Sequence, residues 1–391
     1  MMRTTQLDSP APAVAVGMIG LAAAMGIGRF AFTPLMPLMQ EHAGLTLAQG
    51  GWLAAANYAG YLAGALLCVF ANPNPGAAAR AGLAGVALFT LAMGLTADFA
   101  WWLLWRFLAG VASALVLVGI SAWALQRLER AERAHWAGWV FAGVGVGIVF
   151  AGLVSLVIGV RGTAPGLGWL LLGAAATLIA SLTWPQFSAA QSGSTTRAPM
   201  PMRRFDADAW LLIVCYGIFG FGYIIPATFL PSLARQLLSD PAIFGWTWPV
   251  FGMAAAMSTI GASLMLRNAA PRKVWALCQV VMAMGVVAPL MTPNVGALLF
   301  AAIAIGGTFM VLTMAGMQEA RRVAGNAAPQ LIAAMTAAFA VGQLLGPIVV
   351  SVFSSSTHAL YAPSIAAAAL LIVGAAILSA SRRAHDAFSS I

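Results

Sequence analysis

The sequence predicts an all-α membrane protein in which twelve transmembrane helices form two parallel repeats of six. Composition is the first observation, because 61% of the 391 residues are hydrophobic and only 7% are charged, where about 25% charged residues is usual in soluble domains. The second is a series of long apolar segments, and the third is a likeness between the two halves of the chain. So few charges exclude a soluble enzyme, a disordered chain and a secreted disulfide scaffold, and they require lipid as the main solvent.

Twelve apolar segments are long enough to cross a membrane as helices. Each offers roughly the 17–25 residues that span about 30 Å of hydrocarbon, and none alternates with a period of two, so barrel strands are excluded. Arg29 interrupts the first segment and eleven more follow, so we expect no signal-peptide cleavage. The segments are residues 13–38, 47–70, 79–97, 99–124, 136–160, 166–185, 209–232, 243–267, 272–292, 295–317, 329–355 and 358–380.

The basic residues predict the orientation. With the N-terminus inside, fifteen of the nineteen Lys and Arg residues fall in cytoplasmic segments, Arg161 and Arg235 fall outside, and Arg29 and Arg106 lie within spans. This distribution is the positive-inside pattern. We therefore expect a multi-pass protein of the cell inner membrane with both termini cytoplasmic. The net charge of +9 then reflects topology, and no nucleic-acid partner is expected.

The two halves resemble each other at an offset of 194 residues. The matching positions are Gly26 with Gly220, Gly28 with Gly222, Pro37 with Pro231, and Gly51-Trp52 with Gly245-Trp246. A polar stretch at 187–208 separates them, so we expect an N-terminal six-helix bundle at 1–186, a cytoplasmic linker at 187–208 and a C-terminal six-helix bundle at 209–391. Because six is even, both copies insert the same way up, which predicts a substrate site between them near the middle of the membrane.

Arg29 and Arg106 are the strongest candidates for function. An ionised Arg near the bilayer centre costs about 2.5–3.5 kcal/mol or more, so it needs a partner, a ligand or water. No Asp, Glu or His lies well inside a predicted span. A guanidinium without a carboxylate partner favours an anionic substrate, which it binds with two hydrogen bonds. For Arg106 the alternative stays open that it fastens its helix to backbone carbonyls of a neighbour.

Six further polar residues complete the predicted substrate site. Tyr223 occupies the repeat position of Arg29, so we expect both to face one cavity from opposite halves. Asn57 and Tyr61 are four residues apart and share one helix face, and Gln343 is an amide in the middle of span 11. Thr33 and Thr228 are explained more simply by hydrogen bonds to the carbonyl four residues earlier in their own helix. The predicted substrate-binding residues are Arg29, Thr33, Asn57, Tyr61, Arg106, Tyr223, Thr228 and Gln343, with no catalytic residue, no metal and no cofactor.

Span 5 is rich in glycine, with Gly143, Gly145, Gly147 and Gly152. No strand precedes these glycines, so a nucleotide-binding loop is excluded. Small residues allow helices to approach closely in lipid, and we expect packing to be their role.

Several motifs resemble a known transporter family. Trp105-Arg106-Phe107-Leu108-Ala109-Gly110 resembles the arginine-containing span-4 motif of the major facilitator superfamily, whereas the loop after span 2, residues 71–76, lacks the superfamily's usual charged pattern. More specifically, residues 26–39, 51–61 and 220–231 resemble signatures of its YbfB/YjiJ branch. The resemblance covers nearly the whole chain. It implies the major facilitator fold and a secondary transporter, and it supplies little about the substrate.

We predict a secondary active transporter, not an enzyme, that moves a small anionic organic solute across the inner membrane by alternating access. Its partners are the solute and the lipid bilayer, and we expect a monomer. Two alternatives stay open: an exporter of hydrophobic or cationic compounds, and a membrane signalling or biosynthetic protein without transport. If transport is proton-driven, we favour anion exchange or protons carried by the substrate over a relay through Glu41 at the outer end of span 1.

Overall fold

The computed structural model describes residues 10–71, 73–188, 205–238, 240–265, 269–353 and 359–388, and the regular elements in these ranges are helices. Twelve of them are long and apolar enough to cross a membrane, which confirms the twelve predicted segments. The first span joins α1, η1 and α2, and the eighth joins α9 and α10. In chain order the helices are α1 (Pro10–Leu21), the π-helix η1 (Ala22–Arg29), α2 (Phe32–Ala43), α3 (Leu47–Ala71), α4 (Pro75–Leu95), α5 (Phe99–Arg130), η2 (Ala134–Trp136), α6 (Ala137–Val160), α7 (Pro165–Ser188), α8 (Ala207–Leu237), α9 (Pro241–Phe244), α10 (Thr247–Met265), α11 (Pro271–Met291), α12 (Val295–Ala324), η4 (Gly325–Ala327), α13 (Ala328–Val352) and α14 (Tyr361–Phe388).

Helix ends extend beyond several predicted apolar segments. The helix α5 continues to Arg130 where the apolar pattern ends at 124, and α12 continues to Ala324 where it ends at 317. Outside the hydrocarbon a helix no longer needs apolar side chains, so hydropathy does not register its last turns. The helix α4 begins earlier than predicted, because Asn74 caps its first turn and Pro75 suits the first helical position.

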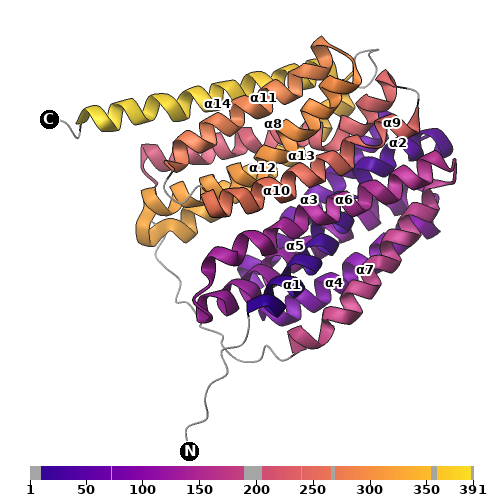
Figure 1. Ribbon diagram of the computed structural model, residues 1–391, viewed down its shortest axis with the longest axis horizontal. Helices are drawn as coiled ribbons and strands as arrows, with labels where there is room; N and C mark the ends of the chain where they lie inside the picture. Colours follow the sequence, from indigo (N-terminus) through magenta and orange to yellow (C-terminus); the bar gives the residue numbers. More distant parts are fainter. Residues whose placement is uncertain are drawn as a thin grey trace, which may run out of the picture.

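The chain forms two groups of helices that lie side by side (Figure 1). In this view α1 to α7 occupy the lower part and α8 to α14 the upper part, with α2 and α9 close together at the right. We call the end at which α1 begins and α14 ends the terminal end, and the opposite end, where α2 and α8 finish, the distal end. Within the first group α5 packs on α3 and α4, and within the second α8 packs on α13 and α11 packs on α12 and α14. The predicted linker at 187–208 lies largely outside the described residues, since α7 ends at Ser188 and the description resumes at Phe205. The division into bundles at that linker stays a prediction.

The two groups meet through α6 with α10, α3 with α13, and α2 with α8. The contact between α6 and α10 depends on glycine. A Cβ on Gly145 would lie 2.4 Å from the nitrogen of Ala256, and a Cβ on Gly252 would lie 2.6 Å from the nitrogen of Val149. No side chain fits at either position, so the predicted packing role of the glycines in span 5 has a physical basis.

A π-helix interrupts the first span. Residues Ala22–Arg29 form η1, and the amide of Phe30 donates to the carbonyl of Met25, five residues earlier, at 3.0 Å. A Cβ on Gly26 would lie 2.3 Å from the backbone of Gly147 in α6. The apolar pattern of residues 13–38 predicts a regular helix and does not indicate this element. Its helical period differs from that of its neighbours, and π-turns inside α-helices often mark functional sites.

Candidate functional site

Arg29 ends the π-helix and lies buried between the two groups of helices. Only 3% of its surface is exposed. Its Nη2 donates to Oε1 of Gln343, which comes from α13 in the opposite group. Three rings lie around the guanidinium carbon, with centroids at 4.1 Å for Tyr61, 5.1 Å for Tyr58 and 5.4 Å for Phe30. Its Nε is buried and has no hydrogen-bond partner among the described residues.

Arg106 lies behind this site and holds the backbone. Its Nε donates to the carbonyl of Leu53 at 3.4 Å, its Nη1 to that of Gly28 at 3.4 Å and its Nη2 to that of Arg29 at 3.1 Å. The ring of Phe32 lies 4.9 Å from its guanidinium carbon. These bonds match the alternative in which Arg106 fastens α5 to neighbouring carbonyls, because all three nitrogens are engaged.

Two further side chains bond carbonyls of the π-helix. The Asn57 Nδ2 donates to the carbonyl of Gly28 at 3.4 Å and to that of Arg106 at 2.9 Å, and the Ser113 hydroxyl donates to that of Ala24 at 2.9 Å. A π-turn disturbs the regular pairing of backbone groups, and buried carbonyls must find other donors. Asn57 and Arg106 therefore fix the backbone from which Arg29 projects.

The expectation for Thr33 and Thr228 is wrong, because neither hydroxyl bonds the carbonyl four residues earlier. The Thr33 hydroxyl donates across the interface to the carbonyl of Ala227 at 3.1 Å, and the Thr228 hydroxyl lies 3.0 Å from that of Tyr58. The carbonyl four residues before Thr33 is that of Arg29, which accepts from Nη2 of Arg106 at 3.1 Å. Both threonines therefore join the two groups of helices.

Tyr223 and Arg29 are both buried in the protein interior, at 1% and 3% exposure. The hydroxyl of Tyr223 has no hydrogen-bond partner among the described residues. Its ring stacks on Phe309 with centroids 5.0 Å apart and planes at 15°. That these two repeat-related residues face one cavity stays a prediction.

The structure brings the predicted residues together from four spans of the two groups, with Arg106 behind them on α5. The first span supplies Arg29 and Thr33, α3 supplies Asn57 and Tyr61, α8 supplies Tyr223 and Thr228, and α13 supplies Gln343. Sequence reasoning missed Tyr58, which contacts both Arg29 and Thr228. The signal was present, since Tyr58 precedes Tyr61 by three residues and so shares its helix face.

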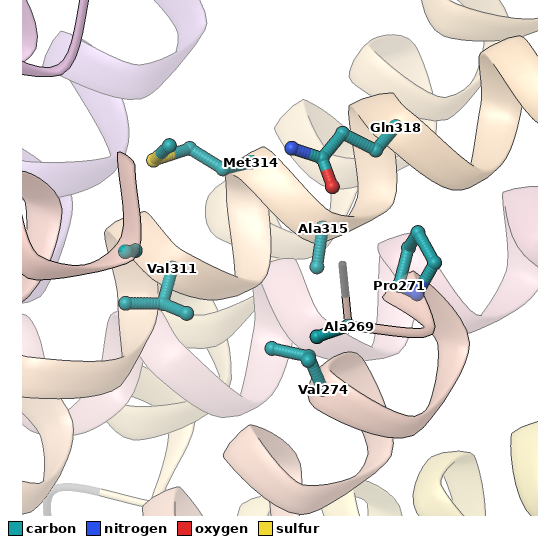
Figure 2. Close-up of a pocket in the computed structure, with 8 residues that line it drawn as sticks. Ala269, Pro271, Val274, Val311, Met314, Ala315 and Gln318 are labelled. Atoms are coloured by element: carbon teal, nitrogen blue, oxygen red, sulfur yellow. The ribbon is translucent and has the colours of Figure 1, made fainter. Parts of the chain in front are cut away.

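Two cavities lie apart from Arg29 and contain none of the predicted residues. One, a small pocket, lies at the terminal end between α10, α11 and α12. Figure 2 shows its lining, in which Gln318 is the single polar side chain beside Val274, Val311 and Met314. The other, also small, lies at the distal end and is lined by residues that include Pro34, Ser155, Pro231 and Trp248. Among the described residues no group of three or more His, Cys, Asp or Glu side chains is placed to hold a metal ion.

Two sets of ion pairs occur near the helix ends. At the distal end Nη2 of Arg235 lies 3.2 Å from Oε2 of Glu41, and its Nη1 donates to the carbonyl of Pro37. At the terminal end Arg272 pairs with Asp208 at 2.7 Å and with Glu319 at 2.9 Å. The first set joins the two groups of helices, and the second joins α8, α11 and α12 within one group.

Comparison with known proteins supports the same fold. A family described as "Uncharacterised MFS-type transporter YbfB" matches residues 21–379. Among solved structures, a mutant form of the nucleoside transporter NupG superposes with a TM-score of 0.75 at 14% identity, over 94% of this chain and 99% of that one. An inward-facing, unoccupied bacterial homologue of the human lysosomal transporter Spinster gives 0.74 at 15% identity, over 97% and 98%. No curated protein sequence matches significantly. These identities show a shared fold alone, but the family match spans almost the entire chain: the protein is a membrane transporter that belongs to the YbfB-type family of the major facilitator superfamily.

Proposed function

We propose that the protein is a secondary active transporter that moves a small organic anion across the inner membrane by alternating access, and that Arg29 binds the anion. The observation that carries the proposal is a buried guanidinium between the two groups of helices whose side-chain acceptor is the neutral amide of Gln343. Among the described residues Arg29 takes part in no ion pair. A buried charge without a counter-ion is costly, and an anionic ligand removes that cost.

The two intramembrane arginines differ in their hydrogen-bond partners. Arg106 has its nitrogens on backbone carbonyls, whereas Nε of Arg29 has no partner among the described residues. A carboxylate or similar anion binds guanidinium through two parallel hydrogen bonds. We therefore assign binding to Arg29 and positioning of the π-helix to Arg106 and Asn57.

Contacts toward the distal end support a state that is closed there. Glu41 pairs with Arg235, Ser351 donates to the carbonyl of Ala48 at 3.1 Å, and Thr33 donates to the carbonyl of Ala227. All three join the two groups of helices. If the distal end is the outer end, as the basic residues predict, alternating access requires these bonds to break when the site opens outward.

The test is uptake of labelled organic anions into proteoliposomes by wild type, Arg29→Gln and a control, Arg161→Gln, which removes an exposed positive charge from the turn between α6 and α7. Removing the charge from Arg29 costs about 1.5–3 kcal/mol, so affinity should fall about tenfold to hundredfold. The control should resemble wild type. Unchanged anion affinity in Arg29→Gln would contradict the proposal. Uptake of cations or neutral compounds without any anion would support the exporter alternative, and no transport of any class would favour signalling.

A further inference from the structure

Five aromatic side chains form a continuous series beside Arg29, and we call them the aromatic arc. The ring of Phe30 lies 6.4 Å from Trp248, Trp248 stacks on Phe251 at 4.7 Å, Phe251 on Phe309 at 5.7 Å, and Phe309 on Tyr223 at 5.0 Å. The three stacked pairs have interplanar angles of 18°, 26° and 15°. One end of the arc adjoins Arg29, because the guanidinium carbon lies 5.4 Å from the centroid of the Phe30 ring.

Two polar atoms of the arc are buried without a partner. The Tyr223 hydroxyl and the Trp248 Nε1 have no hydrogen-bond partner among the described residues, and the two side chains are 1% and 0% exposed. An unsatisfied buried donor costs about 1–3 kcal/mol. At position 223 a phenylalanine would supply the same ring without the cost of the hydroxyl. The arc therefore combines buried aromatic rings with two donors that lack a protein partner among the described residues.

The positive charge of Arg29 favours a ligand with one negative charge. Arg106 has its three nitrogens on carbonyls, so Arg29 is the intramembrane cation with a free donor. One guanidinium balances one carboxylate and leaves the second charge of a dianion buried and unpaired. The amide oxygen of Gln343 accepts from Arg29 in the structure, and a carboxylate is the stronger acceptor because its hydrogen bonds are charge-assisted.

We infer that the substrate is a monocarboxylate with a planar aromatic ring, whose carboxylate replaces Gln343 on Arg29 while its ring lies against the aromatic arc. The inference rests on the proposed function and narrows its substrate class. Rings stack in offset or edge-on arrangements that are worth about 0.5–1.5 kcal/mol beyond burial. A saturated ring of the same size gains the energy of burial but not the energy of aromatic stacking.

The test compares matched ligands on purified protein by thermal shift and by competition. The probes are benzoate and phenylacetate, their saturated counterparts cyclohexanecarboxylate and cyclohexylacetate, and the dianion benzene-1,4-dicarboxylate. An aromatic acid should bind about twofold to tenfold tighter than its saturated counterpart, and the dianion should bind more weakly than benzoate. Phe309→Leu should reduce the aromatic-to-saturated ratio toward one, and Phe309→Tyr should keep it. Phe300→Leu, on the same helix with 44% of Phe300 exposed, is the control that should leave the ratio unchanged.

The outcomes separate this inference from the proposed function. If anions bind through Arg29 but aromatic and saturated acids bind equally, the inference is overturned and the proposed function stands. If Phe300→Leu changes the ratio as much as Phe309→Leu does, the inference also fails. If no organic anion binds and Arg29→Gln behaves as wild type, both fail.

Discussion

Thr33 and Ala227 are joined by a hydrogen bond of 3.1 Å and are separated in the chain by 194 residues, the offset that relates the two halves. Equivalent positions of two repeats touch each other only next to the axis that relates them. The bond therefore marks where the pseudo-twofold axis passes between α2 and α8, one helical turn from Arg29.

Replacing Thr33 by Val should weaken closure at the distal end. The change removes a buried hydrogen bond worth about 0.5–1.5 kcal/mol, so the population with α2 and α8 apart should increase. Spin labels at His42→Cys and Ile243→Cys, both exposed at that end, would report the distance distribution. Thr33→Ser should restore closure, and Thr336→Val, which removes a bond within its own helix, should not alter the distribution. Equal distributions in Thr33→Val and wild type would contradict the role.

Replacing Arg106 by Lys should destabilise the protein although the charge is kept. One ammonium cannot reach the three carbonyls that Arg106 binds on two neighbouring segments. Each hydrogen bond to a charged group contributes about 1.5–3 kcal/mol, so losing those that the ammonium cannot make should lower the melting temperature. Affinities for all anions should fall by a common factor, because Arg29 loses its support and the ligand loses no contact. A change in the order of preference among anions would instead indicate direct contact between Arg106 and the substrate.

Replacing Gly26 by Ala should separate the π-helix from α6. The new Cβ would lie 2.3 Å from the backbone of Gly147, a distance at which the helices must move apart. Overpacking of this kind costs about 1–3 kcal/mol, and we expect lower expression and a lower melting temperature. Gly307→Ala has nothing within 4 Å of its Cβ and serves as the control. Equal stability of the two variants would show that the π-helix can shift without cost.

Replacing Arg272 by Met should be strongly destabilising. The change leaves Glu319, with 4% of its side chain exposed, without its cation, and removing one partner of a buried pair costs about 3–5 kcal/mol. The free energy of unfolding in detergent should fall accordingly. Arg322→Met removes an exposed cation from the same helix as Glu319 and should change it little. An unchanged free energy of unfolding in Arg272→Met would contradict the role of this buried pair in stability.

Replacing Glu41 by Gln should leave transport by exchange intact. The side chains of Glu41 and Arg235 are 50% and 29% exposed, and exposed pairs contribute about 0–1 kcal/mol. Counterflow and accumulation driven by a pH gradient should be compared in liposomes. We expect both to persist in the variant. Loss of gradient-driven accumulation with preserved counterflow would make Glu41 the coupling group.

The fold was predictable because lipid imposes a strict rule on composition. Each span had to be apolar, and each interruption had to be short and polar, so the twelve segments could be read directly from hydropathy. The ends of α5 and α12 could not be read from hydropathy, since their last turns lie where polar residues are permitted. The π-helix was also not predictable, because the glycines at Gly26 and Gly28 are compatible with an ordinary close helix contact.

The sequence predicted which types of residue form the site, but it predicted few of their hydrogen-bond and ion-pair partners. Arg29, Tyr223 and Gln343 are conspicuous because polar groups in the middle of apolar spans are rare. Thr33 illustrates the limit: its own helix offers an acceptor four residues earlier, and nothing local shows that its hydroxyl donates to Ala227 in the other half. The pairing of Arg272 with Asp208 and Glu319 depends in the same way on which helices are neighbours, which hydropathy does not contain.

The contact between α6 and α10 also restricts how the pathway can widen. Where backbone meets backbone, as at Gly145 and Gly252, there is no side chain whose rotamer can change to create room. Enlargement of the passage must therefore occur elsewhere than at these two glycines, at other points where the two groups of helices meet. Substitutions that adapt the transporter to bulkier cargo should accordingly be rejected at Gly145 and Gly252, so a directed-evolution library should leave these two positions unchanged.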